Sequence, residues 1–182
     1  MPVSRPTVIP YVCDWLKDKS RHEIRSVLDV GCGFGLWGFL ARNFIQIWNP
    51  DITRSDYLNW KRNLRVDAIE AVDWYVTSMQ REIYNEIHVG GMVEIMPTLG
   101  SYHLIIVGDT LEHVSLEDGL QFIKNARERS RWLVITMPSY FHRGSAIMGN
   151  DSELHEYVWK DSDFPGNPKI THIGNQRVIQ YG

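Results

Sequence analysis

Short apolar runs and amphipathic stretches alternate along most of this chain. The apolar runs are bounded by turn-forming residues and predict five strands, at 26–30, 65–71, 86–89, 102–108 and 132–137. Apolar residues at helical spacing predict helices at 6–19, 36–47 and 74–84, and a further helix after Ser115. This alternation predicts an α/β fold with a doubly wound, mostly parallel sheet that binds ligands at the carboxyl ends of its strands.

Three segments depart from the alternation. Thr53 and Asp56 have the spacing of a capping box, which predicts an inserted helix over about 53–63. The stretch 139–168 has little periodicity and predicts a long loop on the substrate side of the sheet. Two short apolar runs around Gly174-Asn175 predict a terminal hairpin over 170–181. No linker interrupts the pattern, so we expect one domain over 1–182.

Composition narrows the class of partner and the compartment. The chain has 182 residues, 43% of them hydrophobic, and a formal net charge of −3, which provides no large basic field for a nucleic acid. We therefore expect a small-molecule partner and no membrane contact. The two cysteines, Cys13 and Cys32, are too few for a disulfide framework and predict reduced thiols in a cytoplasmic protein. The sequence leaves the oligomeric state open, a homodimer included.

The most informative motif is a glycine loop that runs Asp29-Val30-Gly31-Cys32-Gly33-Phe34-Gly35, directly after the first strand and before a helix. Glycines let a ligand approach the backbone closely, and the helix N-terminus offers N–H groups to a carboxylate. Two ligands compete for this loop. Gly33, Gly35 and Gly38 also match the dinucleotide spacing, which would make the protein an NAD-dependent oxidoreductase.

The charge of Asp29 favours one of these two candidate ligands over the other. A carboxylate at the strand end repels a pyrophosphate and attracts an ammonium or a sulfonium, by about a few kcal/mol at close range. S-adenosylmethionine carries both cations and is the better fit. Glu70, at the end of the second strand, is placed to accept hydrogen bonds from ribose hydroxyls. The alternatives are a tight turn without a ligand and a solvated acid at the strand end.

Two motifs extend this interpretation to a family. The stretch from Val27 to Gly35 and the run Asp109-Thr110-Leu111-Glu112-His113-Val114 resemble class I S-adenosylmethionine-dependent methyltransferases. The span 24–164 is similar to a small bacterial and phage branch whose substrates are largely unassigned. This resemblance implies a Rossmann-like sheet with strand order 3-2-1-4-5-7-6 and an antiparallel last strand. It implies these cofactor contacts: Asp29, Gly31, Cys32, Gly33, Gly35, Glu70, Ala71, Gly91, Met92 and Asp109.

Two positions depart from the family pattern. Gly91 stands where an acid usually accepts from the adenine amino group, so adenine recognition is expected to fall to backbone groups, beside Met92. His103 follows Tyr102 where an Asp is common, which affects a structural hydrogen bond.

The predicted reaction moves a methyl group to oxygen or nitrogen of a small-molecule or carbohydrate-like acceptor, releasing S-adenosylhomocysteine. His113 is the candidate general base and Asp109 could orient the cofactor or the acceptor, although both could equally serve the helix start alone. Candidate substrate contacts in the long loop are Tyr140, His142 and His155. The spacing of Asp109, Glu112 and His113 is not a strong ligand pattern, so we expect no metal.

Other activities are less compatible with the residues present. The fourth strand is not followed by Asn/Asp-Pro-Pro-Tyr/Phe, and no Pro-Cys nucleophile occurs, which argues against DNA methylation. A non-catalytic cofactor-binding protein of the same fold is the remaining alternative, because of Gly91.

Overall fold

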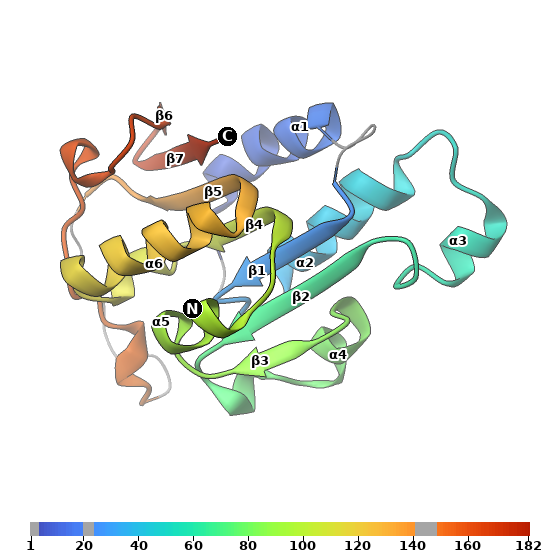
Figure 1. Cartoon of the computed structure of the whole chain (residues 1–182), viewed down its shortest axis with the longest axis horizontal. Helices are drawn as coiled ribbons and strands as arrows, with labels where there is room; N and C mark the ends of the chain where they lie inside the picture. Colours follow the sequence, from blue (N-terminus) through green and yellow to red (C-terminus); the bar gives the residue numbers. More distant parts are fainter. Residues whose placement is uncertain (1–3, 20–23, 141–148) are drawn as a thin grey trace.

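All seven strands belong to one twisted sheet. The computed structural model describes residues 4–19, 24–140 and 149–182 (Figure 1). The strands are β1 (Ser26–Val30), β2 (Arg65–Glu70), β3 (Ile87–Val89), β4 (Tyr102–Gly108), β5 (Ser130–Pro138), β6 (Lys169–Ile173) and β7 (Gln176–Tyr181). Their order is β3-β2-β1-β4-β5-β7-β6, and β7 is antiparallel to both of its neighbours. The predicted fold class and strand order are confirmed.

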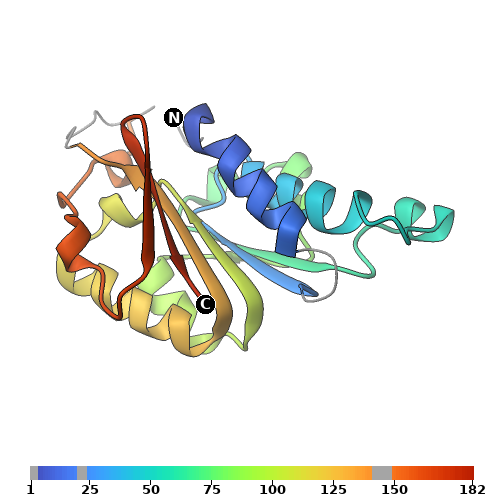
Figure 2. The same cartoon turned by 90° about the horizontal axis from the view of Figure 1, so that it is seen from above.

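Helices cover both faces of the sheet (Figure 2). The α-helices are α1 (Ile9–Lys19), α2 (Leu36–Ala41), α3 (Arg54–Leu58), α4 (Ser78–Ile83), α5 (Met92–Ile95) and α6 (Leu116–Glu128). Successive side chains of a strand point to opposite faces, so Val27 packs with α1 and α2 while Leu28 packs with α5 and α6. The two cores meet only through the sheet, which fixes the positions of the strand ends. None of the helices in the described ranges is long and apolar enough to cross a membrane.

Three predicted helices differ from those observed. The helix at 36–47 continues past Ala41 as a π-helix (Arg42–Ile47). The capping box of Thr53 and Asp56 is present, but α3 ends at Leu58 because Asn59 turns its side-chain amide onto the carbonyl oxygen of Ser55.

The third difference lies between β2 and β3. The predicted helix at 74–84 is split into a 3₁₀ turn (Asp73–Tyr75) and α4, with an extended residue, Val76, between them. Thr77 starts α4 anew through a second capping box with Gln80. The short helix α5 and the 3₁₀ turn after it (Met96–Thr98) were not predicted, because Gly90, Gly91 and Pro97 have the composition of a loop.

Candidate cofactor and acceptor cavity

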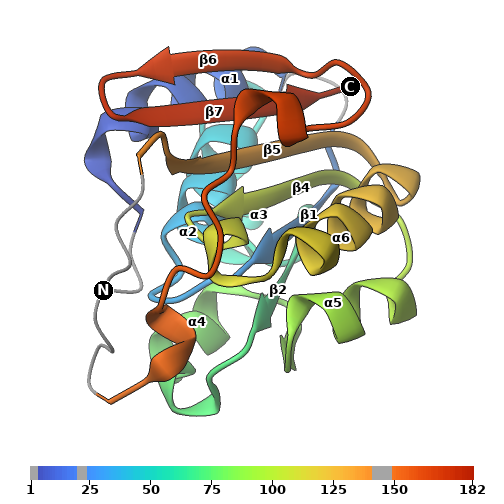
Figure 3. The ribbon, with the colours of Figure 1, turned by 90° about the vertical axis from the view of Figure 1, so that its left-hand side faces the viewer.

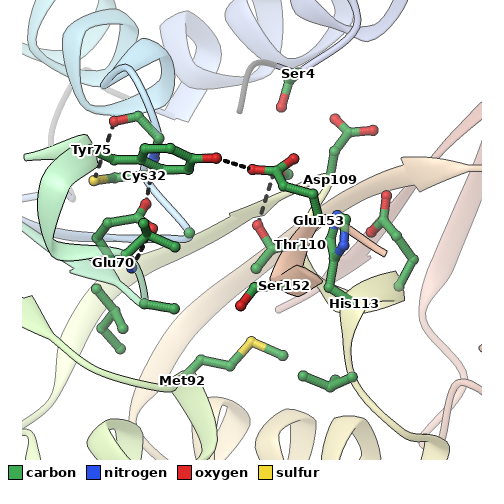
Figure 4. Close-up of a pocket in the computed structure, with 18 of the residues that line it drawn as sticks. Ser4, Cys32, Glu70, Tyr75, Met92, Asp109, Thr110, His113, Ser152 and Glu153 are labelled. Carbon is green, nitrogen blue, oxygen red and sulfur yellow. Dashed lines mark hydrogen bonds between the residues drawn. The ribbon is translucent and has the colours of Figure 1, made fainter. Parts of the chain in front are cut away.

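A cavity of about 700 Å³ opens at the carboxyl ends of β1, β2 and β4 (Figure 4). Parallel sheets with helices on both faces bind ligands at this edge, and the volume suits a small molecule. Ten of the residues predicted from the sequence line it: Gly31, Cys32, Gly33, Glu70, Ala71, Gly91, Met92, Asp109, His113 and His155. The structure thus brings these ten predicted residues together at one edge of the sheet.

Three predicted contacts among the described residues are not on this lining. Asp29 and Gly35 are absent from it, and Tyr140 borders a smaller hollow nearby, with the guanidinium of Arg5 over its ring at 5.6 Å. His142 lies outside the described residues. The contact of the Asp29 side chain with the cofactor stays a prediction, which the lining of this cavity does not support.

The glycine loop is closed by hydrogen bonds within the protein. The N–H groups of Gly31 and Cys32 both donate to the carbonyl oxygen of Ile69, and that of Gly35 donates to Cys32. The N–H of Gly33 donates to Glu70 Oε2 at 2.8 Å. Four of the five N–H groups over 31–35 are thus engaged within the protein, so these residues offer few free donors to a ligand.

The carboxylate of Asp29 connects the end of β1 with α2 and with Tyr84. Its carboxylate is fully buried, and Oδ2 accepts from the N–H of Gly38 at 2.9 Å and from the hydroxyl of Tyr84 at 2.6 Å. A Cβ at Gly38 would collide with the Tyr84 ring, so this glycine permits the close packing of α2 on the strand. Burial raises the pKa of Asp29 from its ordinary 3.8 to about 7, although both hydrogen bonds lower it.

This shift predicts a pH-dependent contribution to stability. Between about pH 4 and 7 the folded protein holds a proton on Asp29 that the unfolded chain has released, so the free energy of unfolding falls as pH rises. Asp29→Asn removes this titration. We expect the melting temperature of the variant, relative to the native protein, to rise steadily from pH 4 to pH 7. A difference in melting temperature between the variant and the native protein that stays constant from pH 4 to pH 7 would show that Asp29 titrates normally.

Glu70 connects the glycine loop to the cavity. Its side chain is 5% exposed and lines the cavity, Oε2 accepts from Gly33, and Oε1 accepts from the N–H of Val72 at 3.0 Å. Each carboxylate oxygen can accept a further bond, so a diol such as a ribose can still be held. Burial raises the pKa of Glu70, and the two backbone donors counteract this effect.

The cavity is acidic. Among its described lining residues are five carboxylates and one guanidinium, that of Arg5: the acids are Glu70, Asp109, Glu112, Glu153 and Glu156. Fields of one sign are focused in a cleft with low-dielectric walls. This lining favours a cationic ligand and disfavours a diphosphate.

Asp109 adopts an unusual backbone conformation at the end of β4, with φ of +49°. A residue other than glycine is strained in this region, and such strain concentrates at functional sites. Its Oδ2 accepts from the Thr136 hydroxyl at 3.3 Å, and burial raises its pKa. Asp109 therefore both fixes the turn after β4 and presents a carboxyl group to the cavity.

His113 is oriented by the long loop. Its Nδ1 lies 3.2 Å from the carbonyl oxygen of Leu154, which can only accept, so Nδ1 carries the proton and Nε2 keeps its lone pair. Burial of the ring lowers the pKa of His113, an effect that the Leu154 carbonyl opposes. The imidazole is therefore neutral near neutral pH and can accept a proton.

The surroundings of the two departures from the family pattern differ. A carboxylate oxygen of Glu94 lies close to where a Cβ of Gly91 would stand, but Glu94 is exposed and is not on the cavity lining. His103 is held by Ser26, whose hydroxyl lies 2.9 Å from the ring Nδ1 and accepts from the His103 N–H at 3.0 Å.

Comparison with known proteins gives matches at the level of structure. No protein-family model matches the sequence, and no curated protein sequence matches it. Magnesium protoporphyrin IX methyltransferase from Synechocystis PCC 6803, solved with bound SAH, is 13% identical, with a TM-score of 0.60 over 95% of this chain and 80% of that one. A methyltransferase from Geobacter sulfurreducens is 15% identical, with a TM-score of 0.61 over 100% of this chain and 80% of the other.

A putative O-methyltransferase from Nostoc punctiforme PCC 73102 gives a TM-score of 0.61 at 12% identity, over 96% of this chain and 56% of that one. The chain has the Rossmann-like methyltransferase fold. Within this methyltransferase fold the cavity occupies the edge of the sheet that the sequence predicted.

Several lining residues were missed from the sequence. They are Ser4, Arg5, Tyr75, Thr110, Glu112, Asn150, Ser152 and Glu153. Thr110 and Glu112 lie inside the motif after β4, so the sequence did carry a signal for them. Tyr75 lies within the predicted helix at 74–84, and the other five lie in segments without periodicity. Figure 3 shows the chain after 149 crossing the strand ends, a path that no local pattern reveals.

Proposed function

We propose that this protein is an S-adenosylmethionine-dependent methyltransferase that acts on oxygen or nitrogen of a small-molecule or carbohydrate-like acceptor. The observation that carries the proposal is the pairing of a closed glycine loop with an acidic cavity. The fold supports it, and the Synechocystis neighbour was solved with a ligand of this class. Fold alone does not establish an activity, so the argument depends on the site.

The closed loop favours a sulfonium over a pyrophosphate. Dinucleotide-binding folds direct free N–H groups of the glycine loop at the pyrophosphate. Here Ile69 and Glu70 already occupy those of Gly31, Cys32 and Gly33, and the carboxylate of Glu70 lies in the same place. A pyrophosphate would meet the charge of Glu70 at the place where those folds offer N–H donors, whereas the sulfonium and the ammonium of S-adenosylmethionine would be attracted.

The residues on the lining fit the parts of S-adenosylmethionine. Gly31, Cys32 and Gly33 would contact the methionine part, Glu70 the ribose hydroxyls, and the buried thioether of Met92 one face of the adenine. Ala71 and Gly91 would contribute backbone groups beside the base. Figure 4 shows Cys32 and Glu70 on one side of the cavity and Asp109 and His113 on the other, which leaves the latter side for an acceptor.

The protein's part in the reaction is alignment and removal of a proton. S-adenosylmethionine supplies the methyl carbon, to which an acceptor lone pair forms a bond while the carbon–sulfur bond breaks. Nε2 of His113 would take the acceptor's proton, and Asp109 would position the acceptor. Asn150, Ser152 and His155 of the long loop would provide its remaining polar contacts. His142 and Tyr140 remain predicted substrate contacts.

The alternative functions are less well supported. The dinucleotide fold has strand order 3-2-1-4-5-6, whereas here an antiparallel β7 lies between β5 and β6. A non-catalytic protein was suggested by the missing acid at Gly91, but the candidate base His113 lines the same cavity as Glu70, which favours a catalytic role. The buried, unpaired Cys13 and Cys32 support work in a reducing cytoplasm, and the acidic cavity supports a small molecule over a nucleic acid.

Labelled-methyl transfer into a fractionated cell extract tests the activity, and mass analysis of the labelled product identifies the acceptor. We expect His113→Ala to lower kcat about 100- to 1000-fold while leaving binding of S-adenosylhomocysteine nearly unchanged, because the ring lies on the acceptor side.

His172→Ala is the matched control, since His172 is half exposed and pairs with Asp161 on the surface. No labelled product from the native protein in any fraction would contradict the proposed activity. Equal rates for His113→Ala and the native protein would remove His113 from the reaction.

A further inference from the structure

We propose that Glu112, His113 and His155 bind one divalent transition-metal cation on the acceptor side of the cavity. The three ligand atoms, one from each side chain, lie within 4.8 Å of one another, and all three residues line the cavity. The spacing of Asp109, Glu112 and His113 alone predicted no metal. The missing ligand comes from the long loop, which the fold brings back to the motif after β4.

The distances suit a site that closes around an ion. Glu112 Oε1 lies 4.0 Å from His155 Nε2, and the two imidazole rings are perpendicular with centroids 4.9 Å apart. Metal–ligand bonds of about 2.1 Å put neighbouring ligand atoms about 3.4 Å apart. A contraction of about an ångström, achieved by small side-chain rotations, is therefore sufficient.

The burial of Glu112 is a second, independent reason to expect a cation at this place. The side chain is 3% exposed, and Oε2 is a buried oxygen without a hydrogen-bond partner. An unpaired buried carboxylate is costly unless a cation or donors compensate it. Because Glu112 lines the cavity, a cation bound there would meet this requirement.

His113 already has the orientation of a metal ligand. Its Nδ1–H donates to the backbone carbonyl of Leu154, which leaves the Nε2 lone pair available. Metal-binding histidines almost always direct their second nitrogen to a carbonyl or carboxylate in this way.

The backbone holds the third ligand in place. The carbonyl oxygen of Glu112 accepts from the N–H of Glu156 at 2.9 Å, and the indole of Trp159 donates to the carbonyl of Leu111 at 3.3 Å. These bonds fix the chain on both sides of Tyr157 against the turn that carries Glu112 and His113. His155 therefore lies at a position set by the fold.

The ligand set indicates which cation would bind. Two imidazoles and one carboxylate suit Zn²⁺, Mn²⁺, Co²⁺ or Fe²⁺, whereas Mg²⁺ and Ca²⁺ prefer oxygen ligands. A second group, Asp67, Glu86 and His88, is also close enough to hold an ion, but Arg65 Nε lies 2.6 Å from Asp67 Oδ2. That carboxylate already has a cation, so we assign the ion to the cavity.

The role of the ion, unlike its binding, rests on the proposed methyl transfer. Three protein ligands leave positions open toward the cavity, where an acceptor hydroxyl could bind. The cation would lower the pKa of this hydroxyl, so that its proton is released to solvent; in the metal-bound protein this step replaces the proton transfer to His113 that is proposed above for the metal-free site. The acceptor atom would then be oxygen.

Titration of metal-free protein, prepared without a histidine tag, with Co²⁺ alone tests the site. We expect one equivalent to bind and to give visible d–d absorption, and each of His113→Gln, His155→Gln and Glu112→Gln to weaken binding at least about tenfold. His172→Gln and His88→Gln are the controls and should bind as the native protein does. Thermal unfolding of each variant verifies that it is folded.

The outcomes separate the two proposals. Binding that is lost in His88→Gln but kept in His113→Gln, or no Co²⁺ binding by the native protein, would overturn the metal site. Calorimetry with S-adenosylhomocysteine on the same preparations reports the cofactor site independently, because Co²⁺ binding requires no cofactor. A metal site without cofactor binding would contradict the proposed function alone.

Discussion

Replacing Glu70 with Ala is expected to weaken binding of S-adenosylhomocysteine by about 100-fold or more. The carboxylate would accept from both ribose hydroxyls, and hydrogen bonds to a charged group contribute about 1.5–3 kcal/mol each. Two such bonds correspond to about two orders of magnitude or more in Kd. The substitution also removes the partner of the Gly33 and Val72 N–H groups, so the loop itself loses its support.

Calorimetric titration measures this effect, and two further variants make it specific. Glu70→Gln keeps the size of the side chain but loses the charge, and we expect an intermediate loss, because one amide group cannot accept from both Gly33 and Val72. Glu82→Ala, on the exposed side of α4, should bind as the native protein does. Native affinity in Glu70→Ala would exclude Glu70 from the cofactor site.

Replacing Arg42 with Met is expected to destabilise the fold by about 3–5 kcal/mol. The guanidinium is fully buried and donates to the carbonyls of Ile83, Trp60 and Leu64 and to Asn85 Oδ1 at 2.5–3.0 Å. Methionine fills a similar volume but leaves these acceptors unsatisfied in the interior. Burial lowers the pKa of Arg42 to about 10, so it remains charged at neutral pH.

Urea unfolding measures this loss, with Arg54→Met on the exposed face of α3 as the matched control. The control should lie within about 0.5 kcal/mol of the native protein. Arg42 joins the end of α4 to the segments before β2 and β3, so its loss should lower stability without removing a contact of the cavity. An Arg42→Met protein as stable as the control would show that these hydrogen bonds contribute little.

The sequence alone predicts the helices and strands whose apolar residues recur in a clear pattern. All seven strands and the order of the sheet could be predicted, the strands from apolar runs and the order from the family resemblance. Glu70 could be placed because it ends a buried strand. The predicted helix boundaries were wrong where a side chain competes with the helical backbone for hydrogen bonds. Asn59 ends α3 with its own side chain, and Thr77 begins α4 after an extended residue.

Asp29 shows why a correct motif can still mislead about a side chain. The strand alternates, so Val27 and Asp29 face α2 while Leu28 and Val30 face α5 and α6. The carboxylate is thus directed beneath the helix, toward Gly38 and Tyr84, rather than into the cavity. Charge at the strand end suggested a ligand contact, but the pleat of the strand determined the actual position.

The contribution of the long loop could not be derived from local patterns. Glu153 and His155 reach the cavity because the N–H groups of Glu156 and Tyr157 donate to the carbonyl oxygen of Glu112, and these contacts join residues far apart in the chain. Spacing within the motif after β4 predicted no metal for the same reason. A ligand set made by tertiary contact is visible only once the fold is known.

The central claim is that the glycine loop and its acidic surroundings hold a sulfonium donor. Parallel calorimetric titrations of the native protein with S-adenosylhomocysteine and with NAD⁺ test this most directly, since they compare the two ligands that the loop could hold. We predict that S-adenosylhomocysteine binds with one-to-one stoichiometry and that NAD⁺ gives no heat of binding up to millimolar concentration. Binding of NAD⁺ with no detectable binding of S-adenosylhomocysteine would contradict it.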